Sequence, residues 1–236
     1  MIFIGMGAPL YRAIFFCIKK KIKINYVCLV NKRENIIYRD YYKQNKIKVT
    51  YNYRLFKKKI GSFKNQIIFS INNSIILDDD ILTTNNVFFN IHNALVQKCR
   101  GNAVVCIFKA LCFKEKFYGL TLHRILPKTK VDAGPVVDQI KFRILKSDNF
   151  FSILSKSLIY HQRIFEKNVF SIIKNKFKRL RVSYSKKSFH YDNLQSIIKE
   201  SNFRQINLAK DLGIFRYKLI RFSYLINKYY KLKKNE

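Results

Sequence analysis

Three polar side chains, Asn90, His92 and Asp132, stand at the ends of apolar, strand-like runs. Asn90 and His92 are two residues apart in the run Phe89-Asn90-Ile91-His92, so an extended backbone turns both to the same side. Asp132 follows later, in the loop-like stretch Val131-Asp132-Ala133-Gly134-Pro135. An amide, an imidazole and a carboxylate together suit acyl transfer, which needs donors for an oxyanion and a group that moves a proton.

The segments that must position these residues alternate between strand and helix patterns. Helices are expected over 10–20 and 148–176, and the runs that read as strands are 2–5, 24–30, 46–51, 66–71, 86–91, 117–125 and 136–144. Nearly continuous apolar strands joined by helical connections predict a parallel sheet that is covered on both faces. In such a sheet the crevice beyond the carboxyl ends of the strands binds ligands, and the three polar residues lie at those ends.

The pattern changes near Tyr184, and two domains are predicted: 1–183 as the catalytic domain and 184–236 as a basic helical tail that folding of the sheet does not need. Within the tail, Ala209, Gly213 and Leu219 fall at the offsets of a helix-turn-helix, where packing needs a small residue, a turn glycine and an aliphatic residue. Simple helical hairpins share this pattern, so it does not by itself predict DNA binding.

The net charge, the cysteines and the apolar runs limit which partners and which cellular compartment the chain can have. The 236-residue chain has a net charge of +33, which suits contact with a polyanion but equally reflects a Lys-, Asn- and Ile-rich composition typical of an AT-rich genome. The five cysteines form no C-x-x-C pair, and their odd number fits a reducing cytoplasm better than a disulfide framework. No segment has the roughly 18 uninterrupted apolar residues of a membrane-spanning helix.

Metal and dinucleotide sites are not supported by the sequence. His and Cys residues are scattered at spacings that do not match metal ligands. The turn Gly5-Met6-Gly7 lacks the third glycine and the acidic residue of a dinucleotide-binding fingerprint. We therefore predict no metal site and assign no cofactor-binding residue.

Four linked motifs resemble the folate-dependent formyltransferase domain family over roughly residues 1–180. They are Asn-x-His at 90–92, Arg-Gly at 100–101, Gly-Leu-Thr-Leu-His at 119–123 and Asp-x-Gly-Pro at 132–135. The chain departs from the family in the run that follows His92, which here is Asn-Ala-Leu-Val-Gln and lacks both of the usual prolines. The shape of that loop is therefore not fixed by the resemblance.

The resemblance implies an α/β fold, a Rossmann-like and mostly parallel sheet flanked by helices, with a short helical C-terminal tail. It also implies an N-formyltransferase in which Asn90 and His92 flank the formyl carbonyl of 10-formyltetrahydrofolate while Asp132 serves proton transfer. His123 occupies a common strand position in the family, and we expect it to have a structural role.

The acceptor is expected to be a primary amine on a small molecule or a carrier. The segment Phe69-Ser70-Ile71-Asn72-Asn73 looks closer to enzymes acting on nucleotide-sugar or carrier-bound amines than to methionyl-tRNA formyltransferases, whose large β-barrel domain has no room after Tyr184. Two alternatives stay open: a methionyl-tRNA formyltransferase-like enzyme, and an inactive family member that binds nucleic acid, which is not favoured. The acceptor and the oligomeric state are open.

Overall fold

The computed structural model describes residues 1–31 and 36–235. The strands are β1 (Ile2–Gly5), β2 (Tyr26–Leu29), β3 (Val49–Thr50), β4 (Ile67–Ile71), β5 (Val87–His92), β6 (Arg100–Gly101), β7 (Phe117–Ile125), β8 (Val136–Arg143) and β9 (Ser188–Phe189). The α-helices are α1 (Gly7–Lys19), α3 (Arg39–Gln44), α4 (Tyr53–Ile60), α5 (Asp79–Leu82), α6 (Ala103–Cys112), α7 (Phe150–Ile173), α8 (Leu194–Glu200), α9 (Phe203–Lys210) and α10 (Ile220–Lys234). Short 3-10 helices are η1 (Ile36–Tyr38), η2 (Tyr191–Asn193) and η3 (Gly213–Tyr217).

Seven strands form the main sheet in the order β3-β2-β1-β4-β5-β7-β8. The pairs β1 with β2, β1 with β4, β2 with β3, and β4 with β5 are all parallel. β5 lies inside the sheet, as the apolar run at 86–91 predicts. The expected helix-flanked, mostly parallel sheet is therefore confirmed, and each strand of the sheet lies at or near its expected place.

By contact density the chain divides into two compact units that share several elements. The first unit contains Met1–Ile91, Leu122–Asp138 and His161–Arg181, and the second contains His92–Thr121, Gln139–Tyr160 and Val182–Glu236. The segment expected as a tail after 183 falls within the second unit, together with α6 and the first turns of α7.

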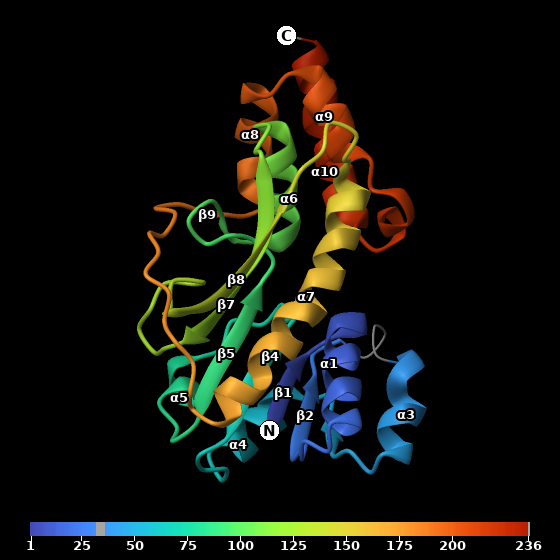
Figure 1. Ribbon diagram of the computed structural model, residues 1–236. Helices are drawn as coiled ribbons and strands as arrows, with labels where there is room; N and C mark the ends of the chain where they lie inside the picture. The colour runs from blue at the N-terminus through green and yellow to red at the C-terminus, as the bar shows by residue number, and fades with distance from the viewer. Residues whose placement is uncertain (32–35, 236) are drawn as a thin grey trace. The chain divides into compact units, whose positions relative to one another are not determined.

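In the first unit, helices cover both faces of the sheet (Figure 1). On one face the rings of Phe3, Phe69 and Phe89 stack in a row across β1, β4 and β5, with centroids 6.1 and 5.5 Å apart. Phe165 of α7 packs edge-on against Phe69 at 5.0 Å. On the other face the sheet packs against Phe56 of α4 and against α5 in a single apolar cluster. Burial on both sides explains why the strands are apolar throughout.

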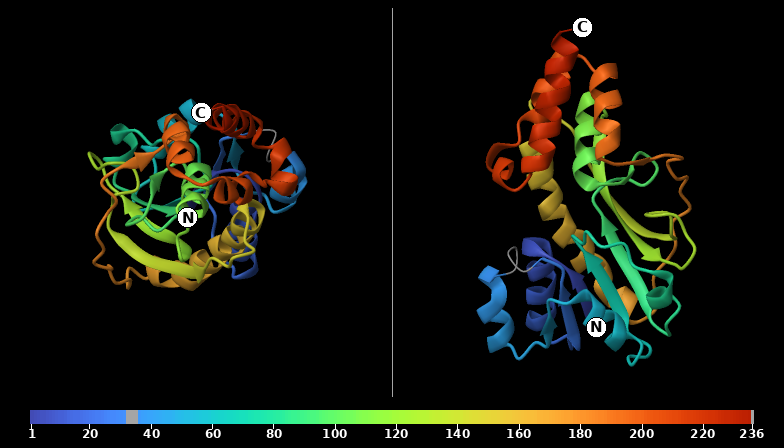
Figure 2. Two further views of the ribbon diagram at one scale, coloured as in Figure 1. Left: turned by 90° about the horizontal axis from the view of Figure 1, so that it is seen from above. Right: turned by 180° about the vertical axis from the view of Figure 1, so that it is seen from behind.

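In the second unit, α8, α9 and α10 pack with α6, and both views of Figure 2 show α10 alongside α8. Phe222 of α10 is fully buried and contacts Phe108 of α6 and Phe150 of α7, with ring centroids 5.7 and 5.5 Å apart. Lys233 donates to the carbonyls of Ile198, Lys199 and Ser201, which closes the C-terminus of α8. A cation suits that position because the last carbonyls of a helix lack partners. The segment after 184 is helical, as predicted, and it contributes to an apolar core.

Candidate active site

Asn90 is held near the carboxyl end of β5, where Asn90 lies opposite Ser70 of β4. Its neighbours Phe88, Phe89 and Ile91 are all buried. These apolar side chains fix the strand from both faces, so the position of the Asn90 amide is set by core packing. The amide thus stands where parallel sheets commonly bind ligands.

His123 and Asp132 come from β7 and from the loop that follows it. The exposed fractions are 2% for His123 and 9% for Asp132. Asp132 has a φ of 54°, a left-handed conformation that Asp adopts more readily than most residues. Buried polar groups of this kind require hydrogen-bond partners, and both residues accept a hydrogen bond from Asn90.

The side chains of Asn90, His123 and Asp132 form a closed polar trio. Asn90 Nδ2 lies 3.2 Å from His123 Nε2 and 3.2 Å from Asp132 Oδ1. His123 Nε2 and Asp132 Oδ1 are 3.4 Å apart. On its other side, His123 Nδ1 lies 3.0 Å from the carbonyl oxygen of Arg124. A carbonyl only accepts, so Nδ1 carries a proton and Nε2 of the neutral ring is an acceptor.

This arrangement gives the trio two hydrogen-bonding states. With neutral His123, one N–H of Asn90 is donated to the imidazole and the other to Asp132. When His123 is protonated, its Nε2–H can instead be donated to Asp132 Oδ1, and the Asn90 N–H that it displaces becomes available to a ligand carbonyl. The trio can therefore couple the position of one proton to the donor capacity of Asn90.

The glycine of the Asp-x-Gly-Pro motif lets this loop approach β7. A Cβ atom on Gly134 would lie 1.9 Å from the Arg124 carbonyl oxygen and 3.7 Å from His123 Nδ1. Any side chain would thus push away the acceptor that orients the His123 ring. Gly134 therefore allows the loop to pass close to β7, where Asp132 can reach His123 and Asn90.

His92, the last residue of β5, belongs to the second unit and is 5% exposed. Its Nε2 lies 3.2 Å from the carbonyl oxygen of Cys99. The loop after His92 is held by side chains of β7: Tyr118 donates to the carbonyl of Asn93, and Thr121 Oγ1 donates to the carbonyl of Ala94 at 2.8 Å. These hydrogen bonds fix the loop without the prolines that the family places there.

Of the residues expected at the site, Asn90 and Asp132 are joined directly by a hydrogen bond. The contact of the His92 side chain described above is with the Cys99 carbonyl in the second unit. His123 was expected to be structural, yet its side chain contacts both Asn90 and Asp132. The signal that could have found it is a histidine closing an apolar strand nine residues before the loop carboxylate.

The Arg-Gly motif holds the start of the C-terminal segment. Arg100 is 4% exposed, and its guanidinium donates to the carbonyls of Ser185 and Lys186 at 2.8 and 3.2 Å. β6, which contains Arg100, pairs in parallel with β9. Arg100 therefore ties the segment that follows α7 into the second unit.

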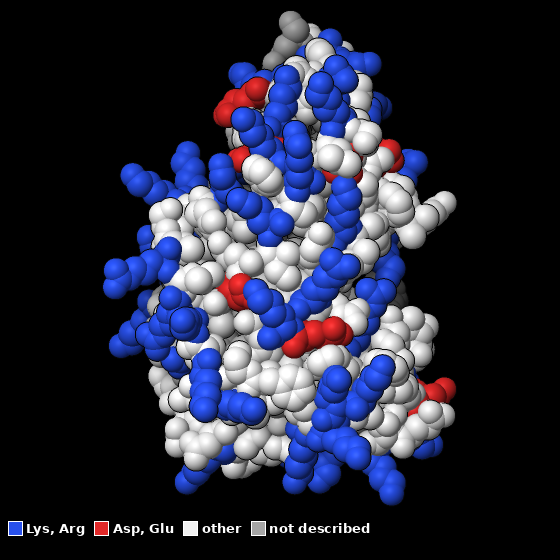
Figure 3. All heavy atoms as spheres, in the orientation of Figure 1, with Lys and Arg blue, Asp and Glu red and all other residues white. Residues whose placement is uncertain are grey.

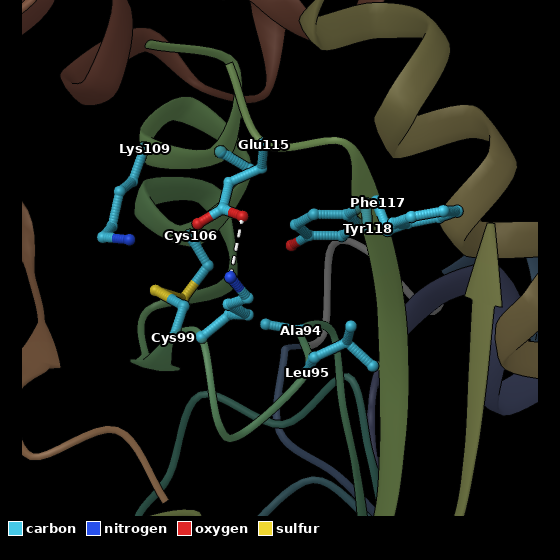
Figure 4. Close-up of a pocket in the computed structure, with 10 residues that line it drawn as sticks. Ala94, Leu95, Cys99, Cys106, Lys109, Glu115, Phe117 and Tyr118 are labelled. Carbon is cyan, nitrogen blue, oxygen red and sulfur yellow. Dashed lines mark ion pairs between the residues drawn. A yellow bond between two sulfur atoms is a disulfide. The ribbon is translucent and has the colours of Figure 1, made fainter. Parts of the chain in front are cut away.

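A small crevice of about 10 Å³ lies beside α6 (Figure 4). Lys98 and Glu115 form an ion pair of 3.2 Å there. Cys99 and Cys106 beside it are joined by a disulfide, with a Cα–Cα distance of 5.7 Å, which corrects the expectation of reduced cysteines only. The argument from C-x-x-C spacing failed because helix α6 returns Cys106 to Cys99 across seven residues. The crevice has room for about one water molecule.

The remaining cysteines are buried, and burial raises the pKa of the thiols of Cys17, Cys28 and Cys112 to about 12. Thiols of this kind are unreactive core residues. Across residues 1–31 and 36–235, no three His, Cys, Asp or Glu side chains converge as metal ligands would. In the same part of the chain, no helix is long and apolar enough to cross a membrane.

The sequence matches no family model and no curated protein. The structure is similar to solved N-formyltransferases. WlaRD, a sugar 3N-formyltransferase determined with dTDP and 5-N-formyl-THF, is 23% identical with a TM-score of 0.65, over 80% of this chain and 68% of that one. The N-formyltransferase of Helicobacter canadensis, in complex with folinic acid and dTDP-3-aminofucose, is 21% identical with a TM-score of 0.66, over 80% and 72%.

Phosphoribosylglycinamide formyltransferase of Bacillus halodurans is also similar, at 14% identity and a TM-score of 0.60 over 73% of this chain and 94% of that one. At these identities the similarity concerns the fold alone. The chain thus has the fold of the N-formyltransferases.

Proposed function

We propose that this protein is a folate-dependent N-formyltransferase that moves the formyl group of 10-formyltetrahydrofolate to a primary amine. The observation that carries the proposal is the trio of half-buried Asn90 with buried His123 and Asp132 in a sheet with the N-formyltransferase fold. Fold alone does not determine function, but fold and a suitable set of polar groups together favour this reaction.

The chemistry makes specific demands that the trio fits. The amine nitrogen attacks the formyl carbon, the carbonyl oxygen becomes an oxyanion, and the C–N bond to the folate then breaks. The amine loses a proton, and the folate nitrogen gains one. Asn90 has an N–H for the oxyanion, and Asp132 is the carboxylate that takes the proton from the attacking amine, directly or through one water.

His92 and His123 have different proposed roles. His92 is proposed as a second oxyanion donor in its imidazolium form, because its Nε2–H is donated to the Cys99 carbonyl and the oxyanion would need a proton on Nδ1. The role rests on its spacing from Asn90, because side chains two residues apart on a strand point to one face. His123 is a positioning residue: its Nε2 contacts both Asn90 and Asp132 and so orients their side chains.

The donor is proposed to be a formylated folate because WlaRD and the Helicobacter canadensis enzyme were determined with such molecules. We propose that the formyl carbonyl is bound by the half-buried amide of Asn90 at the carboxyl end of β5, where it would replace one of the present partners of that amide. No residue is assigned to the pterin.

The acceptor is proposed to be an amine on a nucleotide sugar or on a carrier. The same two relatives bind dTDP or a dTDP-amino sugar, which supports the first class.

We further propose that residues 1–183 carry the catalytic groups and that residues 184–236 form a basic helical tail. We also propose that the protein acts in cytoplasmic one-carbon metabolism. The Cys99–Cys106 disulfide argues against the proposed cytoplasmic location, because disulfides are rare in reducing compartments.

The test is a turnover assay with the full chain. It is incubated with 10-formyltetrahydrofolate and a panel of amines that includes dTDP-amino sugars, simple amino sugars, glycinamide ribonucleotide and aminoacyl carriers. We expect release of tetrahydrofolate with one amine, and loss of that release in Asp132→Asn. Absence of folate release with every amine, in a chain that unfolds cooperatively, would overturn the proposal.

A further inference from the structure

A polar groove of about 340 Å³ lies in the second unit, between the turn after α9 and the helix α10. Its lining includes Lys210, Gly213, Arg216, Ser223 and Asn227. The groove exists because the chain turns sharply at Gly213, which has a φ of +49° and lies so close to Phe151 that a Cβ would be 2.8 Å from its ring. The close approach to Phe151 together with the left-handed backbone favours glycine here, and the turn separates α9 from η3.

The groove is positively charged. Between residues 203 and 235 there are nine Lys or Arg residues and one acidic residue, Asp211. The Asp211 carboxylate already accepts hydrogen bonds from Asn149 Nδ2 at 2.5 Å and from the Gly213 amide at 3.4 Å. Asp211 is thus held in the turn, and the groove lining contains two cations, Lys210 and Arg216, against this single carboxylate, with Lys210 Nζ 4.0 Å from the ring centroid of Tyr230. Figure 3 shows Lys and Arg side chains spread over the visible face, the C-terminal helices included, with few acidic side chains among them.

Large apolar side chains stand exposed beside these cations. Ile214, Tyr217, Ile220 and Tyr224 are 72%, 85%, 71% and 65% exposed. On α10, Ile220, Tyr224 and the groove residue Asn227 follow one another at four- and three-residue intervals, so they share one face. Apolar surface gathered in this way marks an interaction site more often than a packing accident.

The occupant can be chosen by charge and shape. A second copy of this chain would bring like charges together, because the net charge is +33. An acidic protein could also use the cations and the tyrosines, and it is therefore kept as a competing outcome of the test. A single nucleic-acid strand fits both features, since its phosphates pair with Lys and Arg while its unstacked bases lie on tyrosine rings. A duplex has no free base faces to offer.

We propose that the groove and the adjoining face of α10 bind single-stranded nucleic acid, with Lys210 and Arg216 contacting phosphates and Tyr217 and Tyr224 stacking on bases. The site lies in residues 210–227, outside the trio at Asn90, and needs neither folate nor amine. It therefore stands or falls independently of formyl transfer.

The experiment measures binding of a fluorescein-labelled oligouridine, about 12 nucleotides long to span a typical single-strand site, to the full chain by fluorescence anisotropy. The double variant Tyr217→Ala/Tyr224→Ala should raise Kd about tenfold or more, because each stacked base contributes substantially to affinity. Tyr51→Ala, which removes an exposed tyrosine of the first unit, is the matched control and should leave Kd unchanged.

The charge contribution is tested with a second matched pair. Lys210→Ala/Arg216→Ala should raise Kd and flatten its dependence on salt. Arg54→Ala/Lys58→Ala removes the same charge from exposed positions of α4 and should have a smaller effect. Thermal unfolding of each variant checks that the fold is kept. Tyr217→Phe keeps the aromatic ring and should bind the oligonucleotide with the Kd of the wild type.

Three results would overturn the proposal. The first is equal binding by the tyrosine double variant and the wild type. The second is an equal loss from the α4 and groove charge pairs, which would show that binding follows net charge alone. The third is tighter binding of duplex RNA or polyglutamate than of the single strand, which would assign the face to another class of partner.

Discussion

His123 Nε2 and Asp132 Oδ1 lie 3.4 Å apart, and the Asn90 amide nitrogen is 3.2 Å from each of them. Both side chains are nearly inaccessible to water, so their interaction is not weakened by solvent as a surface pair would be. Because Asn90 contacts both His123 and Asp132, the loss of any one side chain leaves a hydrogen-bonding group of the other two without that partner.

Replacing one member of the proposed site should remove most turnover while the fold persists. Asp132→Asn, Asn90→Ala and His92→Ala are each expected to reduce kcat by about 10² to 10³, the usual effect of losing a transition-state stabiliser. Steady-state kinetics with the active amine measures the change. His190→Asn, at an exposed position, is the control. If Asp132→Asn retains more than a tenth of wild-type kcat, Asp132 is not the proton acceptor.

Gly134 should tolerate no side chain, whereas Gly61 should. A Cβ at Gly134 would lie 1.9 Å from the Arg124 carbonyl, while a Cβ at Gly61 meets nothing within 4 Å. Gly134→Ala is therefore expected to displace the loop that carries Asp132 and to lower both turnover and the free energy of unfolding, the latter by about 1–3 kcal/mol. Gly61→Ala should be neutral within about 0.5 kcal/mol. Equal unfolding midpoints for the two variants would contradict the close packing at Gly134.

The aromatic contacts of α10 indicate that the C-terminal segment stabilises the second unit. Phe222→Ala should cost about 3–5 kcal/mol of unfolding free energy, because it empties a fully buried site between Phe108 and Phe150. Tyr224→Ala on the same helix removes an exposed ring and should change little. Denaturant titration followed by circular dichroism distinguishes them.

The same contacts bear on truncation. A chain that ends at residue 183 loses Phe222 and leaves the Arg100 guanidinium without the Ser185 and Lys186 carbonyls. We now expect that chain to unfold at lower denaturant or to aggregate, against the expectation from composition that the sheet does not need the tail. A truncated chain with wild-type cooperativity would restore the original expectation.

The sheet could be predicted from sequence because its strands are buried on both faces, which leaves runs such as 67–71 almost purely apolar. The pairing of Asn90 with Asp132 followed from motif order. The contacts of His123 with Asn90 and Asp132 did not, because a histidine within a strand has the same local sequence whether it packs in the core or contacts polar side chains. The Cys99–Cys106 disulfide and the burial of Phe222 depend on how α6 meets distant segments, which no local pattern encodes.

A further prediction concerns acid stability. The Asp148 side chain is 5% exposed and accepts hydrogen bonds from the Leu145 amide at 2.8 Å, from Ser152 Oγ at 2.8 Å and from Lys156 Nζ at 2.7 Å. Burial, the largest single effect, would raise its pKa, but the hydrogen bonds from Lys156, Leu145 and Ser152 outweigh it and hold the pKa below the ordinary value of 3.8.

Because the pKa of Asp148 is lowered by folding, its contribution to stability is fully present above pH 3.8 and is lost as the pH falls through the lower folded value. Asp148→Asn should therefore destabilise the protein at pH 7, by about 1–3 kcal/mol for charged hydrogen bonds that are lost, and this difference from wild type should shrink below pH 3.8. Asp192→Asn, at an exposed position, is the matched control and should change the unfolding midpoint little at either pH. Chemical unfolding of the three proteins at pH 7 and near pH 3 measures both differences. A destabilisation by Asp148→Asn that is equally large at the two pH values would show that it arises from packing around the amide and not from loss of the carboxylate charge.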